Sequence, residues 1–347
     1  MATLCCVKSR GSAEGSRALN GVWGPKMNNL RLRPCLYIAP VTPIRHDGML
    51  DIATIPRLCR LLQDRGAEGF YVGGGTGEGL LLDCDSRIRL LQAWRNAAGP
   101  RVPLISHVTS ASMKDAHRLA RHAVSEGVIG ISAMAPIVGA VRTPMDLVNY
   151  LADVASAAPD KPFFYYHNPA ATRVSFTASS ILEAAQDSVP SLQGVKFTDE
   201  NLMDLSICMR FDGGRFRIFY GKDEALLPAR IIGATQFIGG AFNVISPLVT
   251  KCLRSFAAGR LDDARDSYHT IVDVIAILRK FGGLCAVKAT MRLLGVDCGP
   301  MLRPARTLDE SESLTLFAAL KAIWPEIAGE SLVTEEPIVE EDEIATA

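Results

Sequence analysis

Eight short apolar runs recur along this chain at intervals of roughly 25 to 30 residues, and each is followed by a longer segment with helical periodicity. Parallel strands that are buried on both faces have continuous apolar sequences of this kind. Glycine or proline bounds each run, as expected for strands that end in turns. The runs are residues 36–40, 69–73, 103–108, 130–135, 162–166, 192–196, 216–220 and 235–239. The pattern predicts eight βα units.

Eight βα units favour a closed barrel over an open sheet. An open doubly wound sheet normally carries a glycine-rich phosphate turn after its first strand, whereas the first run here leads into APVTP at residues 39–43. The segment 51–65 has an apolar stripe, and the segment 112–126 begins with a serine cap. After the eighth run, the segments 261–281, 284–294 and 308–323 predict three further helices. We therefore expect an α/β fold, an eight-stranded parallel TIM barrel with a C-terminal helical extension.

The ends of the chain differ from the middle in charge. Residues 1–34 are basic, with Glu14 as their only acid, and we expect a disordered leader; a signal for import into an organelle is the alternative. We assign residues 35–247 to the barrel and residues 248–326 to the last barrel helix and the helical extension. Residues 327–347 are rich in acids and predict a flexible tail.

The composition excludes several classes of function. The 37 basic side chains equal the 37 acidic ones, so no net charge favours nucleic acid or a membrane surface as a partner. The nine cysteines are scattered without a CxxC pair, which predicts reduced thiols in a reducing compartment such as the cytoplasm. The six histidines show no HxxxH spacing, so we expect no metal site. We expect no other cofactor either.

Lys196 differs from the other lysines in its position. It ends the run 192–196, and the active site of a barrel of this kind lies at the C-terminal strand ends. Lys161 precedes its strand, and Lys222 is separated from a strand end by a glycine. Five further lysines fall in helical patterns: Lys114, Lys251, Lys280, Lys288 and Lys321. Apolar surroundings lower the pKa of an amine, and a neutral amine can form a Schiff base with a ketone. An ordinary surface lysine in a loop is the alternative for Lys196.

Two other strand ends carry polar groups or glycines that could serve a substrate. The turn GGGTGEG at residues 73–79 leaves backbone N–H groups free for an anion such as a carboxylate, with the Thr76 hydroxyl as a further donor. A tight packing turn is the alternative. Tyr165 and Tyr166 follow each other, so only one of them can face the barrel interior, where its phenol could carry protons; a packed aromatic ring is the alternative.

The acids Asp223 and Glu224 begin a helix after the seventh run. Acidic side chains stabilise the positive end of a helix dipole, which is the simplest explanation for their position. That role is compatible with binding the hydroxyl groups of a substrate.

Five motifs in this order and at these spacings resemble a known family: GGGTGEG, YYHNPA, GVKFTDEN, YGKDE and FIGGAFN. The chain is similar, from about residue 36 to residue 308, to the N-acetylneuraminate lyase branch of the dihydrodipicolinate synthase and pyruvate-dependent class I aldolase superfamily. The resemblance implies a metal-free homotetrameric lyase that binds a small keto acid. Its implied reaction is the cleavage of N-acetylneuraminate (sialic acid) to N-acetylmannosamine and pyruvate.

The resemblance also implies roles for individual residues. Lys196 matches the Schiff-base lysine and Tyr166 the proton-carrying tyrosine. The remaining matches are all expected to bind substrate: Gly75, Thr76, Gly77, Thr198, Gly221, Asp223, Glu224 and Gly240. Ala171 stands where the dihydrodipicolinate synthases have an arginine that binds a carboxylate, which argues against that activity.

Three positions depart from the family pattern. Gly75 and Gly240 each replace a hydroxyl-bearing residue, and Val138 replaces an aromatic one. These departures leave two alternatives open. One is an aldolase or dehydratase for another 2-keto-3-deoxy or 4-hydroxy-2-oxo acid. The other is a catalytically weakened barrel that still binds a ligand.

Overall fold

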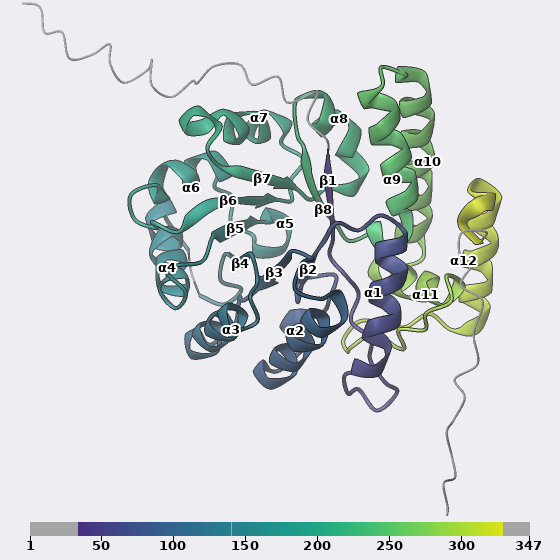
Figure 1. The fold of residues 1–347 in the computed structure, drawn as a ribbon, viewed down its shortest axis with the longest axis horizontal. Helices are drawn as coiled ribbons and strands as arrows, with labels where there is room; N and C mark the ends of the chain where they lie inside the picture. The colour runs from purple at the N-terminus through teal and green to yellow at the C-terminus, as the bar shows by residue number, and fades with distance from the viewer. Residues whose placement is uncertain (1–33, 140, 329–347) are drawn as a thin grey trace, which may run out of the picture.

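The computed structural model describes residues 34–139 and 141–328, so the predicted leader and tail lie almost entirely outside the described residues. Eight parallel strands follow one another around a closed barrel, and β1 pairs with β8 to complete it (Figure 1). The strands are β1 (Cys35–Ile38), β2 (Gly69–Val72), β3 (Leu104–His107), β4 (Gly130–Met134), β5 (Phe163–His167), β6 (Leu192–Phe197), β7 (Arg217–Tyr220) and β8 (Gln236–Gly239). This confirms the predicted barrel and each of its eight strands.

Helices surround the barrel, as Figure 1 shows. They are α1 (Ile55–Asp64), α2 (Cys84–Ala98), α3 (Met113–Ser125), α4 (Pro144–Ser156), α5 (Pro169–Thr172), α6 (Ala178–Ala185), α7 (Leu202–Arg210), α8 (Leu226–Ile231) and α9 (Phe242–Ala257). Short 3-10 turns are η2 (Ile52–Thr54), η3 (Gly79–Leu81), η4 (Phe211–Gly214), η5 (Asp223–Ala225) and η6 (Pro325–Ala328). The Ser112 side chain accepts a hydrogen bond from the Asp115 N–H, which confirms the predicted cap of α3.

The apolar stripe of the segment 51–65 is buried over only part of its length. Ile55, Leu58 and Leu62 lie on the buried face of α1. Ile52 is 38% exposed, because it belongs to the preceding turn η2, where the helical register of the stripe does not apply.

The barrel interior is filled mainly by aromatic rings. Phe219 makes edge-on contacts with Tyr37 and with Phe164, each at 5.3 Å between ring centres. Gly130 makes room for this packing, since a Cβ atom there would lie 2.5 Å from the Phe164 ring. The residues that point inward form one buried cluster: Tyr37, Ala39, Tyr71, Ile105, Met134, Phe164, Tyr166, Phe219 and Ile238. A second and larger core lies between the strands and the helices.

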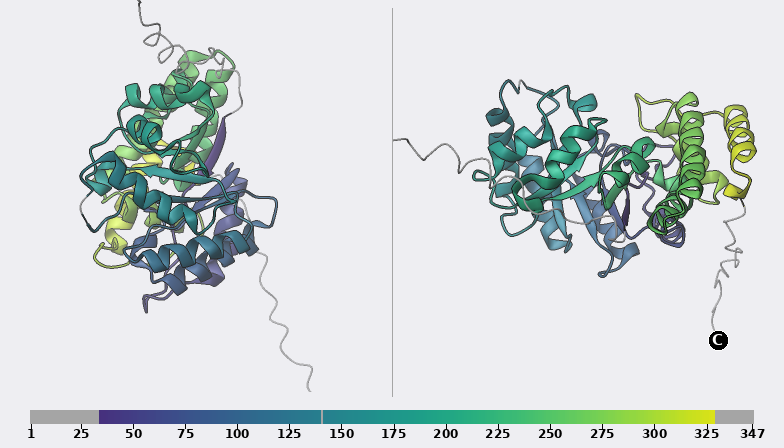
Figure 2. Two further views of the ribbon diagram at one scale, coloured as in Figure 1. Left: turned by 90° about the vertical axis from the view of Figure 1, so that its left-hand side faces the viewer. Right: turned by 90° about the horizontal axis from the view of Figure 1, so that it is seen from above.

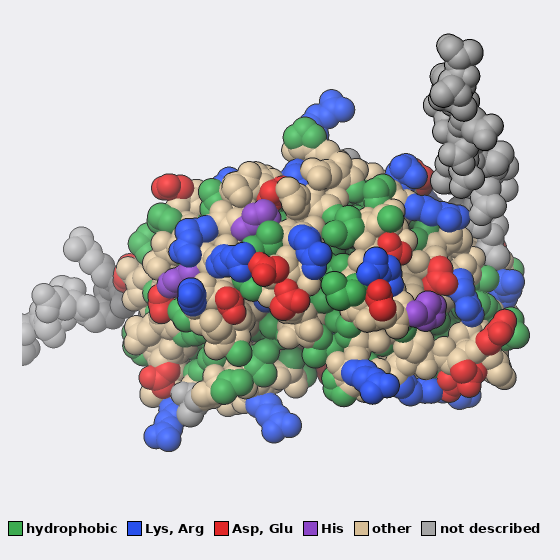
Figure 3. All heavy atoms as spheres, turned by 90° about the horizontal axis from the view of Figure 1, so that it is seen from below, with side chains coloured by type: hydrophobic (Ala, Val, Ile, Leu, Met, Phe, Trp, Pro, Cys, Tyr) green, Lys and Arg blue, Asp and Glu red, His purple; other side chains and the backbone are tan. Residues whose placement is uncertain are grey.

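Three helices follow the barrel and confirm the predicted C-terminal extension: α10 (Leu261–Lys280), α11 (Leu284–Leu293) and α12 (Glu310–Ile323). Figures 1 and 2 show α10 alongside α9, with α12 at the outer edge of the molecule. Within the described part of the chain, no helix combines the length and the apolar character needed to span a bilayer. Basic and acidic side chains are interspersed on the face drawn in Figure 3.

Candidate active site

Lys196 lies near the C-terminal end of β6 and is only 4% exposed. Its Nζ atom lies 3.8 Å from the centre of the Tyr71 ring and 4.1 Å from that of the Tyr166 ring. Burial lowers the pKa of the Lys196 amine to about 7, against the opposing effect of the Asp223 carboxylate. Neutral and protonated amine therefore coexist near neutral pH. The alternative for Lys196 was an ordinary surface lysine in a loop. The structure rules this out, because Lys196 is buried in a strand.

Lys222, the other lysine that follows a strand, has different surroundings. Its Nζ atom lies 2.9 Å from a Glu200 carboxylate oxygen and 3.1 Å from one of Glu224. Burial lowers the pKa of Lys222, but the hydrogen bonds to these two carboxylates outweigh that effect and raise it above its usual value. Lys222 is thus held as a cation, and Lys196 is the better nucleophile of the two.

Of the two successive tyrosines, Tyr166 faces the barrel interior and Tyr165 faces the outer core. The Tyr166 hydroxyl accepts a hydrogen bond from Asn168 Nδ2 at 3.1 Å. Burial raises the pKa of Tyr166, and the polar groups of Asn168 and Thr198 act in the opposite direction. Tyr166 is therefore a neutral phenol with polar neighbours, beside the amine of Lys196. The Tyr165 hydroxyl lies 3.2 Å from His167 Nδ1, away from the interior.

Two pairs of the predicted substrate-binding residues lie in close contact. A Cβ atom at Gly221 would overlap the Thr198 hydroxyl, and one at Gly240 would lie 2.5 Å from Thr76 Oγ1. Thr76 thus lies across from the end of β8. A Cβ atom at Gly75 would meet nothing within 4 Å, so the space beside Thr76 is open on that side.

The glycine-rich turn that carries Thr76 is fixed by hydrogen bonds from outside it. Thr42 Oγ1 donates to the Gly77 carbonyl at 2.6 Å. Within the turn, the Glu78 N–H donates to the Gly75 carbonyl at 3.0 Å. Gly73 has a φ of +75°, a conformation that glycine adopts without strain. The backbone around Thr76 is therefore held in one shape.

The acids Asp223 and Glu224 are adjacent in sequence but have different partners. Asp223 Oδ2 accepts the Ala241 N–H at 2.7 Å, while its Oδ1 is buried with no hydrogen-bond partner among the described residues. Burial raises the pKa of Asp223 to about 7, with a smaller contribution from Glu224. The Glu224 carboxylate instead pairs with Lys222 and with Arg279 of α10. Asp223 therefore has a buried carboxyl oxygen without a partner among the described residues, and its charge acts on Lys196.

Two interior residues near Lys196 were missed by the sequence analysis. The Tyr71 hydroxyl donates to Ser132 Oγ at 3.1 Å. His107 Nδ1 lies 3.0 Å from the Gly73 carbonyl, and burial lowers the pKa of His107 to about 3, so its ring is neutral. Both residues occupy inward positions of their strands. The alternation that separates Tyr165 from Tyr166 would have identified them had it been applied to the second and third strands.

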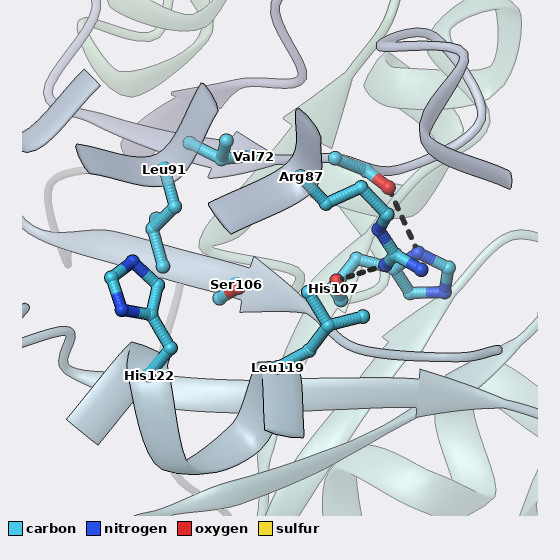
Figure 4. Close-up of a pocket in the computed structure, with 8 residues that line it drawn as sticks. Val72, Arg87, Leu91, Ser106, His107, Leu119 and His122 are labelled. Carbon is cyan, nitrogen blue, oxygen red and sulfur yellow. Dashed lines mark hydrogen bonds between the residues drawn. The ribbon is translucent and has the colours of Figure 1, made fainter. Parts of the chain in front are cut away.

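A small cavity lies behind the active site, between β2, β3 and the helices α2 and α3 (Figure 4). Arg87 crosses it and donates to the His107 carbonyl at 2.5 Å and to the Thr109 carbonyl at 2.6 Å. Ser106 and His122 also line it, whereas Lys196 does not. The cavity thus belongs to the barrel wall, and Arg87 fixes the end of β3 from behind.

Val138, at the third departure from the family pattern, lies in the loop after β4 with 73% of its surface exposed. Val138 is not among the buried residues of the barrel interior. Val138 therefore lies at the surface and not in the barrel interior.

Comparisons with known proteins agree with this geometry. A relative from Mus musculus named N-acetylneuraminate lyase is 32% identical over 293 residues, which cover 83% of this chain and 92% of that protein. A relative of the same name from Gallus gallus is 33% identical over 297 residues, or 84% of this chain and 96% of that protein. The solved structure of Proteus mirabilis N-acetylneuraminate lyase has a TM-score of 0.81 at 31% identity and covers 84% of this chain and 98% of its own.

The model of one protein family matches residues 35–323, which include all eight strands and the three helices of the extension. Its description is the dihydrodipicolinate synthetase family. Because the match extends over most of the sequence, this chain belongs to the dihydrodipicolinate synthetase family.

Proposed function

We propose that this protein is a Schiff-base aldolase that cleaves N-acetylneuraminate to N-acetylmannosamine and pyruvate. The observation that carries the proposal is the buried Lys196 amine, with a pKa of about 7, next to the neutral phenol of Tyr166. Such an amine is nucleophilic at neutral pH. The name shared by the relatives from Mus musculus and Gallus gallus supports sialic acid as the substrate.

The reaction begins when the Lys196 amine attacks the ketone carbon of the substrate and water leaves, which forms an iminium. Tyr166 takes the proton from the C4 hydroxyl and passes its own proton to the substrate carboxylate, so that it remains neutral. The C3–C4 bond then breaks, its electron pair moves into the iminium, and the aldehyde departs. The remaining enamine is protonated at C3, and water releases pyruvate and restores the amine.

The other residues bind the two ends of the substrate. Thr76 and the N–H groups of the glycine-rich turn bind the keto-acid carboxylate, because that turn presents donors in a fixed shape. Asp223 accepts a hydrogen bond from a hydroxyl of the sugar chain through its unpaired Oδ1. Thr198 and Gly221 line the space between these two groups.

The test is to trap the covalent intermediate. Wild-type protein is mixed with pyruvate and borohydride, and the modified peptide is identified by mass spectrometry. We expect one adduct, on Lys196, which is lost in Lys196→Met and retained in Lys222→Met. An unmodified Lys196 at saturating pyruvate would rule out the Schiff-base mechanism.

One observation favours a second candidate, an aldolase or dehydratase for another 2-keto-3-deoxy or 4-hydroxy-2-oxo acid. The Glu224 carboxylate is partly neutralised, because its Oε1 pairs with both Lys222 and Arg279, whereas Asp223 keeps a buried oxygen without a partner among the described residues. A shorter substrate would need fewer such acceptors. A coupled assay of pyruvate release over a panel of these acids distinguishes the two candidates. Adduct formation without turnover of any acid would instead indicate a weakened, ligand-binding barrel.

A further inference from the structure

A buried ion pair joins the glycine-rich turn to the C-terminal extension. Glu78 belongs to the turn, and Lys288 lies on α11, 210 residues further along the chain. Lys288 Nζ donates to Glu78 Oε1 at 2.9 Å, and each of the two side chains is only 2% exposed. Both charges are removed from water, which is costly unless each is fully bonded by the protein.

Both groups of this pair have further partners. The second oxygen of Glu78 accepts the Leu302 N–H at 2.6 Å. Lys288 also donates to the Pro300 carbonyl at 2.6 Å. Burial lowers the pKa of Lys288, and the Glu78 carboxylate opposes that effect. The Glu78 carboxylate is therefore held at two points, by a helix and by the loop that follows it.

The backbone of Glu78 needs such support. Its φ is 54°, in the left-handed region that residues other than glycine seldom adopt. A strained conformation of this kind persists only when the surrounding structure imposes it. The Glu78 N–H donates to the Gly75 carbonyl, so the conformation of Glu78 is linked directly to the segment that contains Thr76. Release of the carboxylate would let this segment relax.

The partners of Glu78 are themselves anchored to the barrel. A Cβ atom at Gly299 would overlap the Ile44 carbonyl, so the loop before Pro300 lies directly against the loop that follows β1. The Ile44 N–H donates to the Cys298 carbonyl at 3.0 Å. Because this loop is fixed against the barrel, its contacts with Glu78 hold the glycine-rich turn in place.

A second contact connects the extension with the other half of the site. The Tyr268 hydroxyl, on α10, donates to the Glu224 carbonyl at 2.6 Å. This contact lies on the loop after β7 and does not involve the glycine-rich turn. The hydrogen bond between Tyr268 and Glu224 serves as a control for the Glu78–Lys288 pair. Its loss removes a contact of the extension without disturbing Thr76.

We propose that Glu78 and Lys288 are positioning residues that set the affinity of the glycine-rich turn for the keto-acid carboxylate. The C-terminal extension then contributes to substrate binding through its contacts with Glu78. This role rests on the proposed function, because it assumes that the turn binds the carboxylate of pyruvate.

The test compares two variants with a control on the same helix. Glu78→Gln keeps the shape of the side chain and removes its charge. The double variant Glu78→Gln/Lys288→Met also removes the amine, so no buried charge is left unpaired. Thr290→Val is the control, since its buried hydroxyl donates only to the Ala286 carbonyl within α11. The measured quantities are the pyruvate concentration at half-maximal borohydride trapping and the melting temperature.

We expect the half-saturating concentration of pyruvate to rise roughly tenfold in both variants, the scale of one charge-assisted hydrogen bond. In the synthetic direction, KM for pyruvate rises while KM for the aldehyde stays at the wild-type value. Thr290→Val leaves the half-saturating concentration unchanged even if it lowers the melting temperature. Tyr268→Phe also leaves it unchanged.

Two outcomes would contradict the proposal in different ways. If wild-type protein forms the adduct and the Glu78 variants lower only the melting temperature, the positioning role is overturned and the aldolase function stands. If wild-type protein forms no adduct, the proposed function fails, and the positioning role fails with it.

Discussion

The amino group of Lys196 lies over the ring of Tyr71, 3.8 Å from its centre. A protonated amine is attracted to the face of an aromatic ring, whereas burial favours the neutral amine. Burial lowers the pKa of Lys196 to about 7, and the Asp223 carboxylate opposes this effect. The Tyr71 ring shields the amine from water. The amine is nevertheless not held permanently protonated.

The first prediction concerns the pH dependence of Schiff-base formation. Only the neutral amine attacks a ketone, and its fraction falls about tenfold for each pH unit below the pKa of Lys196. We expect the initial rate of adduct formation with pyruvate to fall in this way below about pH 7 and to level off above it. Quenched samples analysed by mass spectrometry give these rates. A rate that still increases steeply between about pH 8 and 10 would show that the pKa of the lysine is not lowered.

The second prediction is that Asp223→Asn shifts this profile to lower pH. The Asp223 carboxylate favours the protonated form of Lys196, so its removal lowers the pKa of the lysine further. The two groups titrate in the same range, and the measured midpoint belongs to the pair. We expect a midpoint lower by roughly one pH unit, and hence faster adduct formation at pH 6 than in the wild type.

Glu224→Gln is the matched control for this variant. The Glu224 carboxylate is bound by Lys222 and Arg279 and does not contribute to the pKa of Lys196. Loss of the Glu224 charge lets Asp223 ionise more readily, which favours the protonated lysine, so the midpoint of Glu224→Gln should stay at or slightly above that of the wild type and should not fall. Equal shifts in both variants would mean that net charge at the mouth of the barrel, and not the position of Asp223, controls the lysine.

The positions that the sequence predicted and the structure confirms are those that depend on local periodicity. Apolar runs located the strands, and the strand-end rule separated Lys196 from Lys161. Alternation along a strand required one of Tyr165 and Tyr166 to face inward, and the structure shows that it is Tyr166. Each of these predictions uses residues within one βα unit.

The parts that were missed depend on contacts between distant segments. Lys288 has the sequence pattern of an ordinary helical lysine, and only the fold brings it to Glu78. Asp223 and Glu224 look equivalent in sequence, yet the turn η5 directs Glu224 to Arg279 of α10. Nothing in the sequence near Glu224 indicates that partner, which lies 55 residues away.

The third prediction separates the hydroxyl of Tyr166 from its ring. Tyr166→Phe keeps the ring beside Lys196 and removes the phenol that carries the proton. We expect turnover to fall about 10²- to 10⁴-fold, the usual contribution of general acid–base catalysis, while prolonged trapping still yields the pyruvate adduct. Steady-state kinetics and mass spectrometry measure the two effects.

Tyr71→Phe is the control for Tyr166→Phe. It removes the hydrogen bond to Ser132 and keeps the ring, so we expect a loss of stability of about 1 kcal/mol and less than a tenfold change in turnover. A larger loss of turnover in Tyr71→Phe than in Tyr166→Phe would show that Tyr166 is not the tyrosine that transfers the proton.

The fourth prediction uses the different surroundings of the two glycines that flank Thr76 in space. A Cβ atom at position 240 would lie 2.5 Å from Thr76 Oγ1, whereas one at position 75 would meet nothing within 4 Å. Gly240→Ala must displace the Thr76 hydroxyl, so we expect a loss of stability of about 1–3 kcal/mol and a higher KM for pyruvate. Gly75→Ala should stay within about 0.5 kcal/mol of the wild type. Thermal unfolding and pyruvate kinetics test both variants, and an unchanged KM in Gly240→Ala would show that Thr76 does not contact the keto acid.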